Sequence, residues 1–121
     1  MQEQLNISGA ELAVLQVLWE NNRPMKIQEI CDRLQNENWK YNTVATFLLR
    51  LEGKGAVQSK KQNRANYYIP LIKEEVYQQQ QTKRLIAKLY HGSAKNLAVS
   101  LFRSNDMTAE DIAEIKEMFH L

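Results

Sequence analysis

The stretch KYNTVATFLLRLEGKGAV, residues 40–57, decides the fold. Its apolar residues recur at the spacing of one helix stripe: Val44, Phe47, Leu48 and Leu51. Gly53 and Gly55 then supply a helix end. The match to a helix with one buried face is complete. The opposite face carries polar residues that packing does not need: Asn42, Thr46 and Arg50.

The residues before this stretch predict two more helices. Ser8 and Glu11 have the spacing of a capping box, and the apolar run after them reaches Glu20. Pro24 separates this run from a second, shorter helix over residues 26–35. Cys31 lies within that helix and is the only cysteine of the chain. We interpret it as a small buried hydrophobe, since it has no second cysteine for a disulfide or a zinc site.

The residues after the stretch predict a β-hairpin. AVQSKK (56–61) and YYIP (67–70) contain strand-forming residues and flank the polar tip QNRAN (62–66). We therefore expect a loop of several residues at the tip. Tyr67 and Tyr68 alternate on the returning strand, so one of them is expected to face the core and the other the surface.

Charge is unevenly distributed along the chain. The whole sequence of 121 residues has a net charge of only +2, with 44% hydrophobic and 25% charged residues, which is typical of a soluble globular protein. Residues 40–70 nevertheless hold six basic residues against one acidic residue, Glu52. A concentrated basic segment of this kind indicates a surface that meets phosphate.

Three helices followed by a basic hairpin predict a winged helix-turn-helix in a mainly α fold. Its third helix would lie in the major groove of double-stranded DNA and its wing would reach an adjacent groove or the backbone. The predicted base-reading positions are Asn42 and Thr46, and Thr43 and Ala45 lie at the borders of their face. The predicted phosphate contacts are Arg50, Lys54, Lys60, Lys61 and Arg64. For Asn42 a second interpretation, as a helix cap, stays open.

The C-terminal part of the chain predicts helices with incompletely covered apolar stripes. Helical segments are expected at residues 73–90, 93–102 and 107–119. Since so short a segment offers little mutual core, we expect a dimerisation module. The predicted domains are residues 1–71, which bind DNA, and residues 72–121, which dimerise. The predicted dimer contacts are Leu85, Leu89, Leu97, Leu101, Ile112, Ile115 and Phe119.

Several of these segments together resemble one known family. ISGAELAVLQVLWE (7–20), NTVATFLLRLEGKGAV (42–57) and the wing ending in YYIP resemble the penicillinase repressors, winged-helix regulators of β-lactamase and methicillin-resistance genes. The similarity continues through residues 82–102 and 106–119. The resemblance implies a homodimer, held by its C-terminal helices, that binds palindromic operator DNA and represses transcription.

The resemblance also implies a mode of induction. In that family a membrane β-lactam sensor with a zinc-protease domain triggers cleavage of an Asn-Phe bond, either directly or through a downstream protease. The matching bond here is Ser100–Leu101, which lacks the Asn. Family members often carry a basic residue where this chain has Ala45, so the operator sequence is expected to differ. The chain has no cysteine-rich tail of the kind found in a copper-responsive branch.

The sequence disfavours other classes of protein to different degrees. A winged-helix adaptor that binds an acidic partner, or a regulator of unrelated genes, stays open. An enzyme is disfavoured, because no Ser-His-Asp order, no metal-spaced cluster and no Gly-rich phosphate loop occurs. His91 and His120 are far apart, and we predict no metal and no cofactor. No export signal or spanning segment is seen, so we expect a cytoplasmic location.

Overall fold

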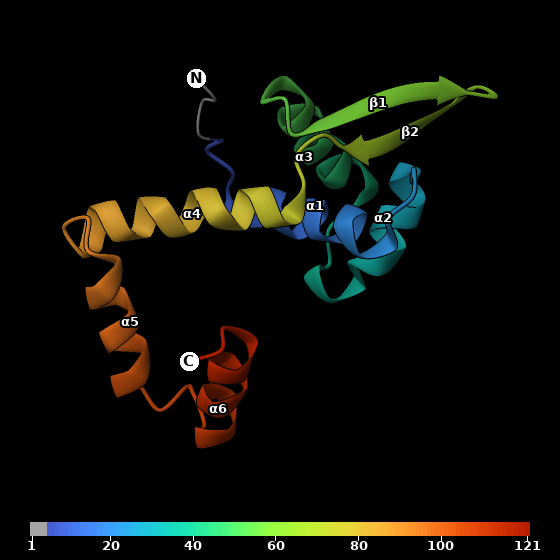
Figure 1. Ribbon diagram of the computed structural model, residues 1–121. Coiled ribbons are helices and arrows are strands. Elements are labelled where there is room, and N and C mark those ends of the chain that lie inside the picture. The colour runs from blue at the N-terminus through green and yellow to red at the C-terminus, as the bar shows by residue number, and fades with distance from the viewer. Residues whose placement is uncertain (1–4) are drawn as a thin grey trace. The chain divides into compact units, whose positions relative to one another are not determined.

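The computed structural model describes residues 5–121 and is mainly helical, with a two-stranded wing (Figure 1). It divides into two units, one reaching to Gln78 and one from Gln79 to Leu121. The predicted boundary after residue 71 stays a prediction, and the first four residues of that predicted domain lie outside the described residues. The fold class, a winged helix-turn-helix followed by helices, is confirmed.

Helix α1 (Gly9–Asn21) begins at the predicted capping box. The Ser8 Oγ accepts a hydrogen bond of 3.2 Å from the Glu11 N–H, and the Ser8 N–H donates to the Glu11 Oε1 at 2.9 Å. These two bonds satisfy donors that a helix start otherwise leaves unpaired. The helix then buries Val14, Leu15 and Leu18 completely, so it forms one side of the core.

Helix α2 (Ile27–Arg33) is shorter than predicted, and a 3₁₀ turn, η1 (Gln35–Glu37), follows it. The Leu34 N–H bonds to the Cys31 carbonyl, three residues back, so the last turn tightens into 3₁₀ geometry. Cys31 packs against the core but is only partly buried, and the prediction of a buried side chain is wrong to that extent. Burial, and then the charge of Asp32, raises the pKa of its thiol.

Helix α3 (Tyr41–Gly53) has the predicted apolar stripe. Val44, Leu48 and Leu51 are completely buried, while Phe47 is partly buried and packs edge-on against Trp39, with 5.0 Å between the ring centroids. Gly55 follows the helix with φ +79°, a conformation that glycine adopts without strain. The chain can therefore turn directly from α3 into the wing.

The wing consists of β1 (Val57–Gln62) and β2 (Ala65–Pro70), paired antiparallel. The pairing continues to Gln62 and Ala65, so only Asn63 and Arg64 form the loop, and the prediction of a longer loop is wrong. Both residues have positive φ, 52° and 68°, as a type I′ turn requires, and the twist of that turn matches the twist of paired strands.

The base of the wing is attached to the helices on one side. Tyr68 is buried and Tyr67 is only partly buried, which confirms the predicted alternation. The Tyr68 backbone also exchanges two hydrogen bonds with Met25, of 2.8 and 3.1 Å, in an isolated bridge just before α2. The wing is therefore tied to the start of the second helix as well as to the end of the third.

Three helices follow the wing: α4 (Glu74–Leu89), α5 (Ala94–Arg103) and α6 (Ala109–Met118). The Ser93 Oγ caps α5, and Thr108 with Asp111 forms a capping box at the start of α6. None of residues 79–121, all of which the structure describes, is buried. Within residues 5–121 no helix has the length and apolarity needed to cross a bilayer.

Candidate nucleic-acid interface

The exposed face of α3 carries the predicted base-reading residues. Asn42 and Thr46 are exposed, and Thr43 and Ala45, at the border of this face, are partly buried. The Thr46 Oγ1 donates its hydrogen to the Asn42 carbonyl at 2.9 Å. The hydroxyl oxygen keeps its lone pairs free, so it can accept a hydrogen bond from the amino group of a base.

Asn42 does not cap the helix. The helix begins at Tyr41, and the cap position belongs to Lys40, whose side chain makes no capping bond. Asn42 therefore lies inside the first turn, and the alternative interpretation as a cap is wrong. Its amide group is exposed and can take the geometry with which Asn recognises adenine.

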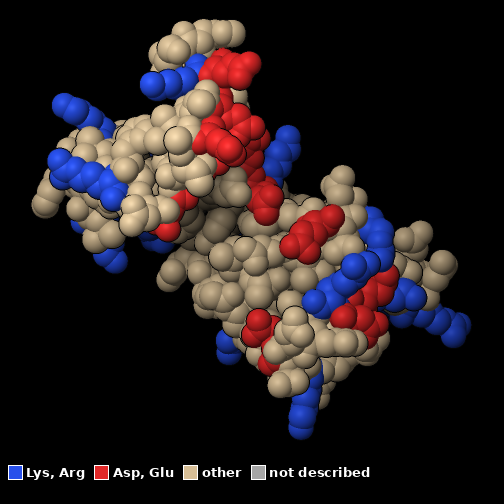
Figure 2. All heavy atoms as spheres, turned by 90° about the horizontal axis from the view of Figure 1, so that it is seen from below, with Lys and Arg blue, Asp and Glu red and all other residues tan. Residues whose placement is uncertain are grey.

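Most of the basic residues that we predict to contact phosphate have no ion-pair partner among the described residues. Lys60, Lys61 and Arg64 on the wing are exposed, as is Arg50 on α3. Among residues 5–121 no carboxylate lies within ion-pair distance of these four side chains. Figure 2 shows a face on which Asp and Glu side chains lie among Lys and Arg side chains, so the basic character is not spread over the whole surface.

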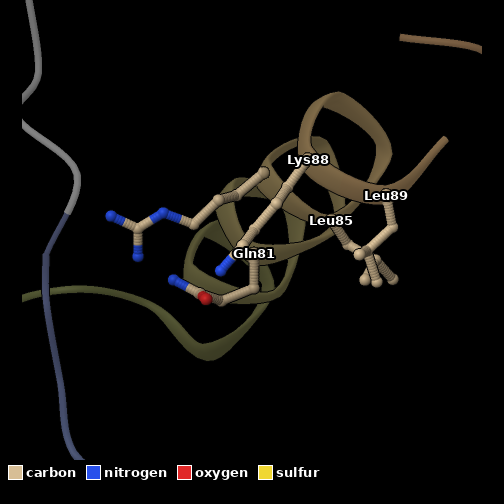
Figure 3. A pocket seen from close by; sticks show the side chains of 5 residues that line it. Gln81, Leu85, Lys88 and Leu89 are labelled. Carbon is tan, nitrogen blue, oxygen red and sulfur yellow. The ribbon is translucent and has the colours of Figure 1, made fainter. Parts of the chain in front are cut away.

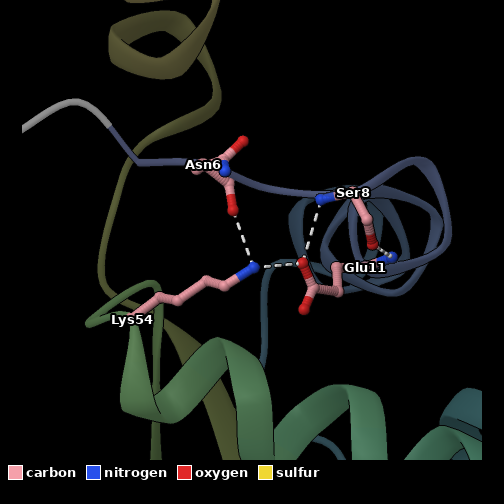
Figure 4. A network of polar contacts seen from close by, with 4 residues as sticks. All are labelled: Asn6, Ser8, Glu11 and Lys54. Atoms are coloured by element: carbon pink, nitrogen blue, oxygen red, sulfur yellow. Dashed lines mark hydrogen bonds and ion pairs between the residues drawn. The ribbon is translucent and has the colours of Figure 1, made fainter.

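Lys54 differs from the other basic residues because it already has partners. Its Nζ lies 2.6 Å from the Glu11 Oε1 and 2.7 Å from the Asn6 carbonyl oxygen (Figure 4). The Glu11 side chain is only 2% exposed. The contact joins the end of α3 to the start of α1. The contact of Lys54 with phosphate stays a prediction. Part of its charge is already compensated by Glu11.

The Glu11 carboxyl has a shifted pKa. Burial raises this pKa, but the hydrogen bonds from Lys54 and from the Ser8 backbone outweigh burial, and the net result is a pKa below the usual value. The charged form is therefore the one that the folded domain stabilises. Nothing in the local sequence around Glu11 indicates this contact, because Lys54 lies 43 residues away.

A second carboxylate holds the wing against α3. The Glu52 Oε2 accepts hydrogen bonds from the Ser59 N–H at 2.7 Å and from the Ser59 Oγ at 2.6 Å. These bonds lower the pKa of Glu52. Sequence reasoning missed this role, although Glu52 stands out as the single acidic residue among residues 40–70. The bonds therefore connect the last turn of α3 to the first strand of the wing.

A groove of about 330 Å³ lies between the start of α2, the start of α3 and the tip of the wing. The residues that line it are Lys26, Ile27, Gln28, Tyr41, Arg64, Ala65 and Asn66. The Lys26 Nζ lies 5.5 Å from the centroid of the Tyr67 ring, at cation–π distance. Of these residues only Arg64 was predicted to bind DNA, because the groove unites segments that are separate in the sequence.

The predicted dimer contacts lie on exposed or partly exposed faces of the second unit. Leu85 and Leu89 point from the same side of α4, where they line an open groove with Gln81, Arg84 and Lys88 (Figure 3). Leu101 on α5, Ile115 on α6 and Phe119 directly after α6 are exposed, and Leu97 and Ile112 are partly buried.

The predicted cleavage bond, Ser100–Leu101, lies inside helix α5. The Ser100 Oγ lies 3.2 Å from the hydroxyl of Tyr90, the residue after α4, which donates a hydrogen bond to it. Leu101 is exposed. The bond is therefore on an accessible helix, and its backbone is in helical conformation.

The sequence of this chain matches one family of known proteins. The model of the penicillinase repressor family matches residues 7–120. The penicillinase repressor of Bacillus licheniformis is 28% identical over 112 residues, covering 93% of this chain and 88% of that protein. The methicillin resistance regulatory protein MecI of Staphylococcus aureus (strain N315) is 26% identical over 115 residues, covering 94% and 93%.

Two solved structures support the comparison over 64% of the chain. The solution structure of the DNA-binding domain of the repressor BlaI is 36% identical, with a TM-score of 0.55, and covers 64% of this chain and 94% of that one. The monomeric form of Bacillus licheniformis BlaI, solved in complex with the blaP half-operator, has the same identity and coverage and a TM-score of 0.53.

Proposed function

The chain belongs to the penicillinase repressor family, a family of DNA-binding transcriptional repressors without enzymatic activity, and on this premise we propose that it binds a palindromic operator as a homodimer. The observation that carries the proposal is the exposed polar face of α3 beside a wing whose Lys60, Lys61 and Arg64 have no carboxylate partner among residues 5–121. Basic side chains without an ion-pair partner can bind the phosphates of a DNA duplex, and the neighbouring helix fits its major groove.

The proposed roles divide between reading and positioning. Asn42 and Thr46 offer an amide and a hydroxyl group to base edges, and Thr43 lies at the border of their face. Arg50 and the wing residues contact phosphates, which hold the protein in register but carry little sequence information. Ala45 offers only a methyl group. Where relatives use a basic side chain at this position, a guanine contact worth about 1–3 kcal/mol is absent here.

Dimerisation is proposed through the second unit. Leu89, the last residue of α4, is 60% exposed, and Phe119, which follows α6, is 65% exposed. Burying each such side chain in a partner stabilises an assembly by roughly 1.5–3 kcal/mol. A second copy of the chain is the occupant we propose, because a palindromic operator presents two identical half-sites.

We propose that the regulated genes are β-lactam-resistance genes. Repression is relieved by cleavage in α5. The cleaving enzyme is a membrane β-lactam sensor protease or a protease that acts downstream of it. Residues of α5 are at most partly buried, so local opening around Ser100 and Leu101 costs little free energy. A protease can then reach the bond from the opened state.

A pair of substitutions on α3 tests the proposed readout. An operator duplex is selected from a random pool with the full-length protein, and its affinity is compared with that of a scrambled duplex. Arg50→Ala should weaken binding to both duplexes alike. Thr46→Ala should weaken binding mainly to the selected duplex, by roughly 1–3 kcal/mol, because it removes a base contact. Equal losses on both duplexes for both variants would exclude Thr46 from sequence readout.

A further inference from the structure

The groove between α2, α3 and the wing has a composition suited to an anion. Lys26 and Arg64 place two cationic groups around it, and Gln28, Tyr41 and Asn66 add polar hydrogen-bonding groups. Tyr41 is 50% exposed, so its hydroxyl group is not needed for core packing. Side chains of this kind, drawn from three separate elements, can surround a phosphate on several sides.

The cationic groups of this groove have no ion-pair partner among the residues that the structure describes. The nearby Glu29 carboxylate is occupied elsewhere: its Oε2 lies 2.8 Å from Arg23, and its Oε1 accepts from the Lys26 backbone N–H at 3.0 Å. Among residues 5–121 no carboxylate lies within ion-pair distance of the Lys26 or Arg64 side chains. The charge therefore remains available to an external anion.

Lys26 is also held in position by the wing. Its ammonium group lies over the ring of Tyr67, 5.5 Å from the centroid. A cation–π contact restricts the long side chain while leaving its N–H donors free. Because Tyr67 belongs to β2, this contact links the position of Lys26 to that of the wing.

The position of the groove indicates which anion it takes. In a winged helix bound to DNA, α3 enters the major groove and the wing reaches the adjacent groove, and the sugar-phosphate backbone runs between the two. We propose that Lys26, Tyr41 and Arg64 form a binding site for one backbone phosphate of the operator, at the strand that separates these grooves. The inference rests on the proposed DNA-binding function and adds Lys26 and Tyr41 to its contacts.

The first test measures the salt dependence of DNA binding by the full-length protein. Affinity for the selected and the scrambled duplex is measured by fluorescence anisotropy over a series of KCl concentrations. Lys26→Met should weaken binding to both duplexes roughly two- to fivefold. It should also reduce the slope of log K against log salt by up to about 0.9, the value for one neutralised phosphate, because Arg64 remains at the site. Tyr41→Phe should weaken binding to both duplexes and leave this slope unchanged, because it removes no charge.

The matched control is Lys73→Met. Lys73 is exposed and follows Ile72, whose carbonyl accepts from the Trp19 Nε1 on the α1 side of the domain, and it does not line the groove. This variant removes the same charge and should leave the slope unchanged. Thermal unfolding of each variant establishes that all of them are folded under the binding conditions.

The second test locates the phosphate. Single neutral methylphosphonates are placed at successive positions of the selected duplex. The wild-type protein should lose affinity at a position between the major-groove half-site and the wing, and Lys26→Met should show a smaller loss at that position, because only Tyr41 and Arg64 still contact the phosphate. Such coupling assigns the contact to the Lys26 side chain.

Two results have distinct meanings. If Lys26→Met keeps the wild-type slope and every methylphosphonate penalty, the phosphate site is wrong, even when the protein still prefers the selected duplex. If the protein prefers no duplex, the proposed operator recognition is wrong. In that case the slope measured on the scrambled duplex still decides whether Lys26 contacts phosphate.

Discussion

The two units of the chain use similar helices with opposite results. In the first unit Leu15, Leu18 and Leu48 have no exposed surface, whereas in the second unit Leu89 is 60% and Phe119 is 65% exposed. Both units have amphipathic helices with side-chain or backbone caps. The difference teaches that an amphipathic helix specifies which face must be covered, and that covering it takes elements from other parts of a chain or another chain.

The first unit obtains this cover from distant segments. Met25 pairs with Tyr68, and the Trp19 Nε1 donates to the Ile72 carbonyl at 2.9 Å, across 53 residues. In the second unit the tie between α4 and α5 joins Tyr90 and Ser100, only ten residues apart. Long-range contacts close a core around α1 and α3, and contacts of short range leave the faces of α4, α5 and α6 open.

The largest expected effect separates the two units by stability. Leu48→Ala should lower the free energy of unfolding by about 2–5 kcal/mol, because the side chain is completely buried and its removal leaves a cavity. Leu101→Ala, the control in the second unit, should change the unfolding of the first unit by less than about 0.5 kcal/mol. Urea denaturation followed by Trp19 and Trp39 fluorescence measures both. Equal losses would contradict the contrast between the units.

The next effect concerns assembly. A fragment ending at Gln78 keeps Ile72 and Tyr77, which contact Trp19, and should stay folded. It should sediment as a monomer and bind the operator about 10²-fold more weakly than the full-length protein, because its two half-site interactions are no longer linked. Analytical ultracentrifugation and anisotropy check this. A dimeric fragment would assign dimerisation to the first unit instead.

A smaller effect is expected from the ion pair that joins α1 to α3. Lys54→Met should cost about 1–3 kcal/mol, because it leaves the buried Glu11 carboxylate without its cation. The pKa of Glu11 is lowered by folding, so its stabilising contribution is present above the unfolded pKa and is lost as pH falls through the folded pKa.

Unfolding experiments between about pH 6 and pH 3 measure this dependence, in the range where carboxyl groups titrate. The wild-type protein should lose the Glu11 contribution on acidification. In Lys54→Met, burial raises the pKa of Glu11 without the opposing cation, so this contribution should shrink or change sign. Lys73→Met should follow the wild type. Parallel pH profiles of all three proteins would show that the contact does not stabilise the fold.

The smallest effect is expected at the tip of the wing. Arg64→Gly should stabilise the fold by less than about 1 kcal/mol, because glycine adopts the positive φ of this turn without steric cost. The same change should weaken DNA binding and reduce its salt slope by up to about 0.9, since Lys26 remains at the shared phosphate. Asn63→Gly is the control, since it relieves the turn and removes no charge. An unchanged slope in Arg64→Gly would remove the wing tip from the phosphate contacts.

Several elements could be predicted because their causes lie within a few residues. The capping box of Ser8 and Glu11, the buried stripe of α3 and the alternation of Tyr67 and Tyr68 all depend on neighbours up to seven positions apart. The end of α2 and the length of the wing turn were mispredicted. Both depend on how far a hydrogen-bonded ladder continues, which small differences in backbone geometry decide.

The sequence by itself determined the helix order, the exposed face of α3 and the basic wing, because periodicity, capping and charge are properties of residues close together in the chain. Only the tertiary structure decided which charges remain free. Lys54 meets Glu11 across 43 residues, whereas Lys26 comes to lie on the wing at Tyr67, beside Tyr41 and Arg64. These juxtapositions follow from the path of the chain, since a charge is neutralised by whatever the fold places within a few ångströms of it.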